Sequence, residues 1–285
     1  MRPAAPLAVL MPFALPARGV PFDSGIAIPR AILSGRALVI LLVAFAASLA
    51  VGEALAAPGR AGVLETMLKW VPVIFTGFLF NLLVSVLAMA LGTVAGAGLG
   101  LAQLSPVAPL ARLAWAVTQF FRNAPWLVLL FYAMSLLPFE LMVAGWSVPF
   151  PAWIKAVVGL ALPVMANVSE IVRGGVQSIP ITQWEAARSL AFSRRRTMWQ
   201  IILPQAVKRM TPPWMNLYAI LTMATPLISI IGISDAMTLT RGALSAEGRP
   251  ELLIPMYLML LVWFFLYSYP IARWTRRLEA RFAVR

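Results

Sequence analysis

The stretch EAARSLAFSRRR, residues 185–196, is strongly charged in a chain that is 61% hydrophobic and only 12% charged. It lies in a polar segment, 173–212, that is bounded on both sides by apolar runs, 152–172 and 213–233. A helix needs about 20 apolar residues to cross a hydrocarbon core of about 30 Å, and each run is that long. Strands of a membrane barrel would alternate in polarity instead of forming continuous runs. The stretch is therefore predicted to belong to a loop between two membrane-spanning helices.

The same reading along the whole chain predicts an all-α fold, a polytopic membrane helix bundle with about six transmembrane helices. The second run is longer than one straight crossing needs, so tilt or an amphipathic lead-in at 68–75 is expected. Small residues recur every three or four positions in LGTVAGAGLG (91–100), which predicts close packing of this helix inside the bundle. Pro125 and Pro163 are expected to kink their helices. The predicted spans are 36–52, 71–102, 113–137, 152–172, 213–233 and 252–272.

The basic residues predict the orientation of the chain, because cytoplasmic loops of membrane proteins are enriched in lysine and arginine. With the N-terminus inside, 18 of the 23 basic residues fall in cytoplasmic segments. Both termini and the polar loop are therefore expected in the cytoplasm. The outer segments keep Arg60, Lys69, Lys155, Arg241 and Arg249.

Four parts follow from the spans and the charges. The first is a cytoplasmic tail, 1–35, which has no pattern of a cleaved signal. The second, 36–69, is an extra N-terminal transmembrane helix with its outer connection. The third, 70–272, is the main transmembrane domain, and it contains the cytoplasmic loop 173–212. The last, 273–285, is a basic cytoplasmic tail whose sequence RWTRRLEARF is typical of an amphipathic anchor at a lipid surface.

Composition excludes several function classes. The chain has no cysteine and no histidine, so thiol nucleophiles, imidazole bases and the usual zinc or haem ligands are absent, and no metal site or cofactor is expected. The net charge of +13 is explained by the cytoplasmic loops, so nucleic acid is not expected as a partner. The 10 acidic residues form no Asp-x-x-x-Asp pattern, which argues against a polytopic membrane enzyme such as a lipid-linked transferase. A secondary transporter stays an alternative, although no clear inverted repeat supports it.

Local signals within the polar loop predict two short helices. Thr182 lies three residues before Glu185, the spacing of a capping box, which predicts a helix from Gln183 to about residue 190. Ser193 offers a second N-cap, so an elbow is expected near 192–193. The three arginines that follow Ser193 oppose the dipole of the second helix, and either lipid headgroups or an acidic protein surface should compensate them.

The order of motifs in the loop resembles the EAA loop of ABC importer permeases. The loop holds EAA at 185–187, a small residue at 191 and IILP at 201–204. The resemblance implies that this loop is a coupling helix that docks in a groove of a cytoplasmic ATPase subunit. The glycine usual in the family is Ala191 here, and alanine adopts a left-handed backbone only at a cost. The residues assigned to ATPase coupling on this basis are Glu185, Ala186, Ala187, Arg188, Ala191 and Pro204.

Further motifs are similar to one branch of that family, the permeases of the polar amino-acid, histidine/glutamine type. The resemblance covers roughly 70–280 and implies the five-helix permease core of the branch plus one extra N-terminal helix. It implies a binding-protein-dependent importer in a bacterial inner membrane, with no covalent chemistry in this chain. The motifs are SEIVRGGVQSIPITQWEAARSLAFS (169–193), QFFRNAPWLVLLFY (119–132), ILPQAVKRMTPPWMN (202–216) and TPLISIIGISD (225–235).

The resemblance also implies the partners of the chain. These are a cytoplasmic ATPase dimer, a second permease subunit, a periplasmic or lipid-anchored solute-binding protein, and membrane lipids. The branch more often has charged residues just before Thr225, where this chain has Met223 and Ala224. That difference favours a heterodimer in which a related permease supplies the missing charges, and a second copy of this chain is the alternative.

Five polar residues at membrane depth are candidates for the solute pathway, because ionisable or polar groups there are costly and often functional. Each has a structural alternative. Arg122 could extend to the inner interface, and Glu170 could form an ion pair with Arg173 three residues on. The other three could make hydrogen bonds between helices. The candidates are Asn81, Arg122, Glu170, Thr225 and Ser229.

Overall fold

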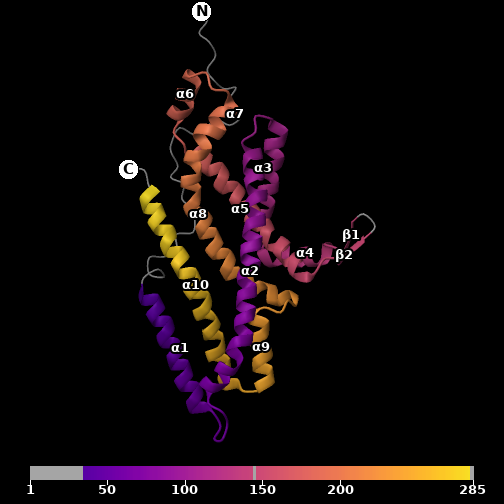
Figure 1. The fold of residues 1–285 in the computed structure, drawn as a ribbon, viewed down its shortest axis with the longest axis vertical. Coiled ribbons are helices and arrows are strands. Elements are labelled where there is room, and N and C mark those ends of the chain that lie inside the picture. Colours follow the sequence, from indigo (N-terminus) through magenta and orange to yellow (C-terminus); the bar gives the residue numbers. More distant parts are fainter. Residues whose placement is uncertain (1–34, 144–145, 283–285) are drawn as a thin grey trace, which may run out of the picture.

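The computed structural model describes residues 35–143 and 146–282, so most of the predicted N-terminal tail and the last three residues lie outside the described part. The described chain is an elongated helix bundle (Figure 1). Its main helices are α1 (Gly35–Leu55), α2 (Val63–Gln103), α3 (Ala108–Asn123), α4 (Trp126–Leu136), α5 (Ala152–Gln177), α8 (Leu203–Ala224), α9 (Ala236–Glu247) and α10 (Leu253–Phe282). The shorter elements are the strands β1 (Glu140–Val143) and β2 (Trp146–Pro149), the helices α6 (Ile181–Ser189) and α7 (Arg194–Arg196), the π-helix η1 (Thr197–Ile202), and the 3₁₀-helices η2 (Thr225–Ile231) and η3 (Pro250–Leu252).

Five helical segments within the described part are long and apolar enough to cross a membrane. Together with the shorter apolar helix α4 they confirm the predicted bundle of membrane helices. The five segments are Gly35–Leu55, Val63–Gln103, Ala152–Gln177, Arg194–Ile231 and Pro250–Arg281.

The predicted span 113–137 is wrong as a single helix, because the structure divides it into α3 and α4. The backbone is extended at Ala124 and Pro125, with ψ of 138° and 131°. Proline has no N–H to continue a helix, and its ring disfavours helical geometry in the residue before it. Pro163, in contrast, stays inside α5.

Three more features differ from the expectation. A short antiparallel hairpin pairs β1 with β2, in register Leu141 to Val148. The region 234–251 contains the helix α9, where only a connection was expected. The helix α10 also continues to Phe282 without a break, so the described part of the predicted C-terminal tail extends the last span.

The core of the bundle is the contact between α2 and α5, and it confirms the close packing that the small-residue spacing predicted for the first of these helices. A Cβ on Gly92 would lie 2.5 Å from a Val164 methyl, and one on Gly96 would lie 2.5 Å from the carbonyl oxygen of Met165. Glycine therefore lets the two backbones approach to a distance that no side chain would permit. The helix α2 has 41 residues, which at 1.5 Å per residue give about 60 Å, and it connects the two ends of the molecule (Figure 1).

Candidate functional site

The candidate site for coupling lies at one end of the bundle, where α6 and α7 project beyond the long helices (Figure 1). We call residues 178–204 the elbow. Its first helix begins at Ile181, directly after Pro180, and no side chain caps it. The predicted capping box of Thr182 and Glu185 is therefore wrong. Pro180, with φ of −54°, already has the φ of a helix start, so the helix begins before Thr182 can act as its cap.

The helix α6 ends in a turn that sequence reasoning considered costly for this residue. Ala191 has φ of +56°, the only positive φ of a non-glycine residue in the described part of the chain. Phe192 N–H donates to Ala187 O (3.0 Å), and Ala191 N–H donates to Arg188 O (2.8 Å). These two bonds form a Schellman motif, in which glycine usually occupies the left-handed position. The elbow thus keeps the geometry of a glycine turn although it carries alanine.

The second helix of the elbow begins as predicted. Ser193 is its N-cap, and its Oγ accepts a hydrogen bond from Arg196 N–H (3.4 Å). Arg194 Nη2 donates to the carbonyl oxygen of Leu104, the C-cap of α2 (3.1 Å). Since the C-terminal end of a helix carries a partial negative charge, α2 supplies part of the compensation that the arginines need.

Further contacts fix the elbow to the bundle. Arg209 Nη1, in α8, donates to the carbonyl oxygen of Ser178 at the end of α5 (2.6 Å). A buried apolar cluster fills the inside of the bend, so α2, α5 and α8 all hold it. The buried members of this cluster are Val176, Ile179, Ile202 and Ala206.

The outer side of the elbow is exposed in the part of the chain that the structure describes. Five of the six residues assigned to coupling are exposed: Glu185, Ala186, Arg188, Ala191 and Pro204. Ala187, with 1% of its surface exposed, faces the interior of the elbow. Ala187 therefore has a packing position, whereas the others form a surface that a partner can reach.

Two of the predicted pathway residues meet in one polar cluster between α2, α3 and α5. Arg173 Nη2 lies 2.6 Å from Glu170 Oε2, and Arg122 Nη1 lies 3.7 Å from the same oxygen. Gln103 Nε2 donates to Ser169 Oγ (2.7 Å), the neighbour of Glu170. The ion pair of Glu170 with Arg173, the structural alternative, is thus present, and Arg122 joins it.

The other three candidates lie around η2 and α9. Asn81 Nδ2 donates to Asp235 Oδ2 (3.1 Å), and Asn81 Oδ1 accepts from Ala236 N–H (3.1 Å). Thr225 is fully buried, and its hydroxyl donates to the carbonyl oxygen of Thr222 (2.8 Å). Asn81 and Thr225 thus serve contacts within the chain.

Ser229 is different, because its partner is a cation. Arg241 Nη2, in α9, donates to Ser229 Oγ (2.6 Å). Sequence reasoning had counted Arg241 only as a basic residue of an outer segment. A signal for its helix was present, since Asp235 and Gly248 have the types and the spacing of an N-cap and a C-terminal stop.

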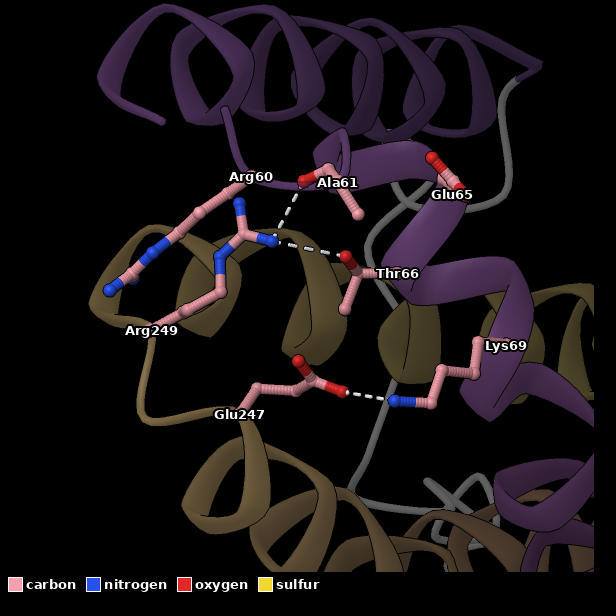
Figure 2. Close-up of a pocket in the computed structure, with 7 residues that line it drawn as sticks. All are labelled: Arg60, Ala61, Glu65, Thr66, Lys69, Glu247 and Arg249. Atoms are coloured by element: carbon pink, nitrogen blue, oxygen red, sulfur yellow. Dashed lines mark hydrogen bonds and ion pairs between the residues drawn. The ribbon is translucent and has the colours of Figure 1, made fainter. Parts of the chain in front are cut away.

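The opposite end of the bundle carries a charged pocket of about 460 Å³ between the α1–α2 connection, the start of α2, the end of α9 and Arg249 (Figure 2). Arg249 Nη1 donates to Ala61 O (2.8 Å) and to Thr66 Oγ1 (3.1 Å), which fixes the connection to α2. Lys69 Nζ lies 2.8 Å from Glu247 Oε1. The hydrogen bonds from Lys69 and from the Trp70 indole hold the pKa of Glu247 below its usual value.

Comparison with known proteins gives the family of this chain. Residues 92–284 match the family described as "Binding-protein-dependent transport system inner membrane component". The chain belongs to this family. The family match confirms the prediction that rested on the EAA loop.

Individual members of the permease family show how far the likeness extends. "Inner membrane amino-acid ABC transporter permease protein YhdY" of Escherichia coli (strain K12) is 35% identical over 58% of this chain, which covers 44% of that longer protein. "Probable glutamine ABC transporter permease protein GlnP" of Bacillus subtilis (strain 168) is 30% identical over 73% of this chain and 93% of its own length. A solved structure described as an amino acid ABC transporter with histidines superposes with a TM-score of 0.64 at 27% identity, over 76% of this chain and 99% of that one.

Proposed function

We propose that this chain is the membrane-spanning permease subunit of an ABC importer that carries polar amino acids into the cytoplasm. The observation that carries the proposal is the elbow, whose exposed side bears Glu185 while its inner side is fixed to the bundle. The names of the relatives support amino acids as the solute class.

The partners follow from the same proposal. A cytoplasmic ATPase dimer hydrolyses ATP, and one of its subunits receives the exposed side of the elbow. A second permease, either a related chain or a second copy, completes the pathway, and a solute-binding protein delivers the amino acid from outside. The orientation rests on the 18 of 23 basic residues that then face the cytoplasm, together with the elbow and both termini. Residues 1–35 and 273–285 would then flank the transmembrane part, 36–272, as cytoplasmic segments.

The chain itself transmits motion and performs no covalent step. When the ATPase dimer closes, it moves the elbow, and the contacts of Arg194 with α2 and of Arg209 with α5 carry the motion into the helices that form the core. Because packed cores have discrete arrangements, such a movement shifts the population between an outward-facing and an inward-facing packing.

Reconstitution tests this function. The chain is purified with its ATPase and second permease, placed in liposomes, and supplied with the solute-binding protein and radiolabelled amino acids. Uptake should require hydrolysable ATP and should stop with a non-hydrolysable analogue. Uptake that an ion gradient drives without ATP would instead support a secondary transporter.

A further inference from the structure

The chain has a broken helix inside its transmembrane domain. The helix α8 changes to the 3₁₀-helix η2 at Thr225, the chain turns at Gly232 with φ of +84°, and α9 starts after Asp235. Irregular backbone at membrane depth is tolerated only where protein buries it or where it lines a water-filled cavity. Discontinuous helices are a frequent way to build solute sites near the membrane midplane.

Contacts at both ends of α9 give its position along α2. At its start, Ala236 N–H is bonded to Asn81 Oδ1, and at its end Glu247 is bonded to Lys69 and Trp70. Lysine and tryptophan side chains are typical of the membrane interface. The 11 residues from Trp70 to Asn81 span about 16 Å of helix, which reaches about the middle of a 30 Å hydrocarbon core. Arg241, between the two ends of α9, is therefore inside the membrane.

The helix α9 is a rigid support for Arg241. Asp235 caps it by accepting from Thr238 N–H (2.9 Å), and Asn81 holds Asp235 from α2. A Cβ on Gly77 would lie 2.6 Å from the Ala236 nitrogen, so the two backbones are in direct contact. A side chain on a helix that is fixed at both ends is held in place before any ligand arrives.

Arg241 lacks an acidic partner among residues 35–143 and 146–282, where its only hydrogen bond goes to the hydroxyl of Ser229. It is nevertheless exposed on the surface of the single chain. A guanidinium at this depth is costly when it faces lipid, so this surface should face a polar space. In a transporter of two permease subunits, that space is the pathway between them.

We propose that Arg241, oriented by Ser229, binds the α-carboxylate of the amino acid in the pathway. The proposal rests on the function proposed above and names the part of the solute that the permease recognises. The planar guanidinium has N–H groups that match a carboxylate in two parallel hydrogen bonds, and one Nη2 bond to Ser229 leaves others free. Since every amino acid has this carboxylate, the subsite fixes the class of the solute while other contacts select the side chain.

The test compares amino acids with their α-carboxamides, in which a neutral amide of similar shape replaces the carboxylate and one of its acceptor oxygens becomes an NH2 group. The purified permease–ATPase complex, without the solute-binding protein, is titrated with radiolabelled L-glutamine, L-arginine and L-histidine, and each is competed with its own amide. In the native complex the amide should compete about tenfold or more weakly than the acid. In R241Q, affinity for the acid should fall to that of the amide, while affinity for the amide stays the same.

Two variants and one separate measurement complete the test. R241K should keep part of the preference for the acid because the charge remains, and R60Q, at the exposed end of the bundle, should keep all of it. The subsite is overturned if the R241Q complex still prefers the acid to the amide. It is also overturned if the native complex takes up amino acids but binds acid and amide equally well. ATP-dependent uptake by the native complex is scored separately, so failure of the importer function itself would be distinguishable.

Discussion

At the scale of single residues, Ala191 keeps the left-handed backbone of the turn that ends α6, although this conformation is unfavourable for alanine. Its φ of +56° strains an alanine but not a glycine. We therefore predict that A191G stabilises the protein by about 1 kcal/mol, because relief of roughly 1–2 kcal/mol of left-handed strain exceeds the roughly 0.4–1 kcal/mol that glycine costs through the unfolded chain. The midpoint of thermal unfolding in detergent should rise. The matched control is A186G, which places glycine inside α6 and should lower the midpoint, and an equal decrease in A191G would contradict this account of the turn.

A second prediction at this scale concerns pH and the pocket in Figure 2. Hydrogen bonds from Lys69 and Trp70 lower the pKa of Glu247 from its ordinary value of 4.5. A carboxyl whose pKa is lower when folded stabilises the protein above the unfolded pKa, and this stabilisation is lost as pH falls through the folded pKa. Between pH 6 and pH 3, the thermal midpoint of the native chain should decrease more than that of E247Q. Parallel decreases would show that the contact contributes nothing to stability.

What the sequence can predict at this scale depends on the range of the interaction. The Ser193 cap was predictable because its bond reaches only to Arg196. Thr182 was assigned wrongly because a competing local signal, Pro180, starts the helix earlier. The bond of Arg241 to Ser229 was not predictable, since it joins two different elements, although Asp235 and Gly248 marked the helix that carries Arg241.

At the scale of elements, the contact of α2 with α5 depends on glycine. A Cβ on Gly96 would lie 2.5 Å from a backbone oxygen of Met165, whereas a Cβ on Gly98 would meet nothing within 4 Å. We predict that G96A costs about 1–3 kcal/mol through overpacking, and that G98A is neutral or stabilises by up to about 1 kcal/mol through helix propensity. Thermal unfolding and the yield of monodisperse protein measure both. Equal behaviour of the two variants would contradict the close packing.

The elements that the sequence predicted are those with long apolar runs. The run 71–102 became the central part of α2, and 152–172 became most of α5. The run 113–137 had the length of a span, but Pro125 divides it, and a kink and a complete break have the same signal in sequence. The hairpin and α9 were missed because their short, mixed segments lie between stronger signals, although the two runs 140–143 and 146–149 have the spacing of a two-residue hairpin.

At the scale of the whole molecule, the bundle has a different surface at each end. One end has the elbow, with an exposed outer side and an inner side fixed to three long helices. The other has the charged pocket, where Arg249 fastens the α1–α2 connection to α2. The bundle, its family and the position of the elbow could be predicted from the sequence, because span length and motif order carry them. The bonds that fix the elbow to α2 and α5 required the structure, since they join segments up to 90 residues apart.

The central claim is that an ATPase moves the bundle through the elbow, and the variant E185K tests it most directly. Glu185 is exposed on the elbow and has no side-chain bond within the described chain, so its reversal should leave the fold intact. A like-charge contact at a protein interface costs several kcal/mol, enough to reduce coupled uptake about tenfold or more. The control, E279K, reverses an exposed charge on α10 at the same proposed side of the membrane.

The measurement is the number of amino acids imported per ATP hydrolysed by reconstituted native, E185K and E279K complexes. The account predicts that this ratio falls about tenfold or more in E185K while E279K matches the native complex. A native ratio in an E185K complex that is inserted and assembled would contradict the claim that the elbow couples ATP hydrolysis to transport.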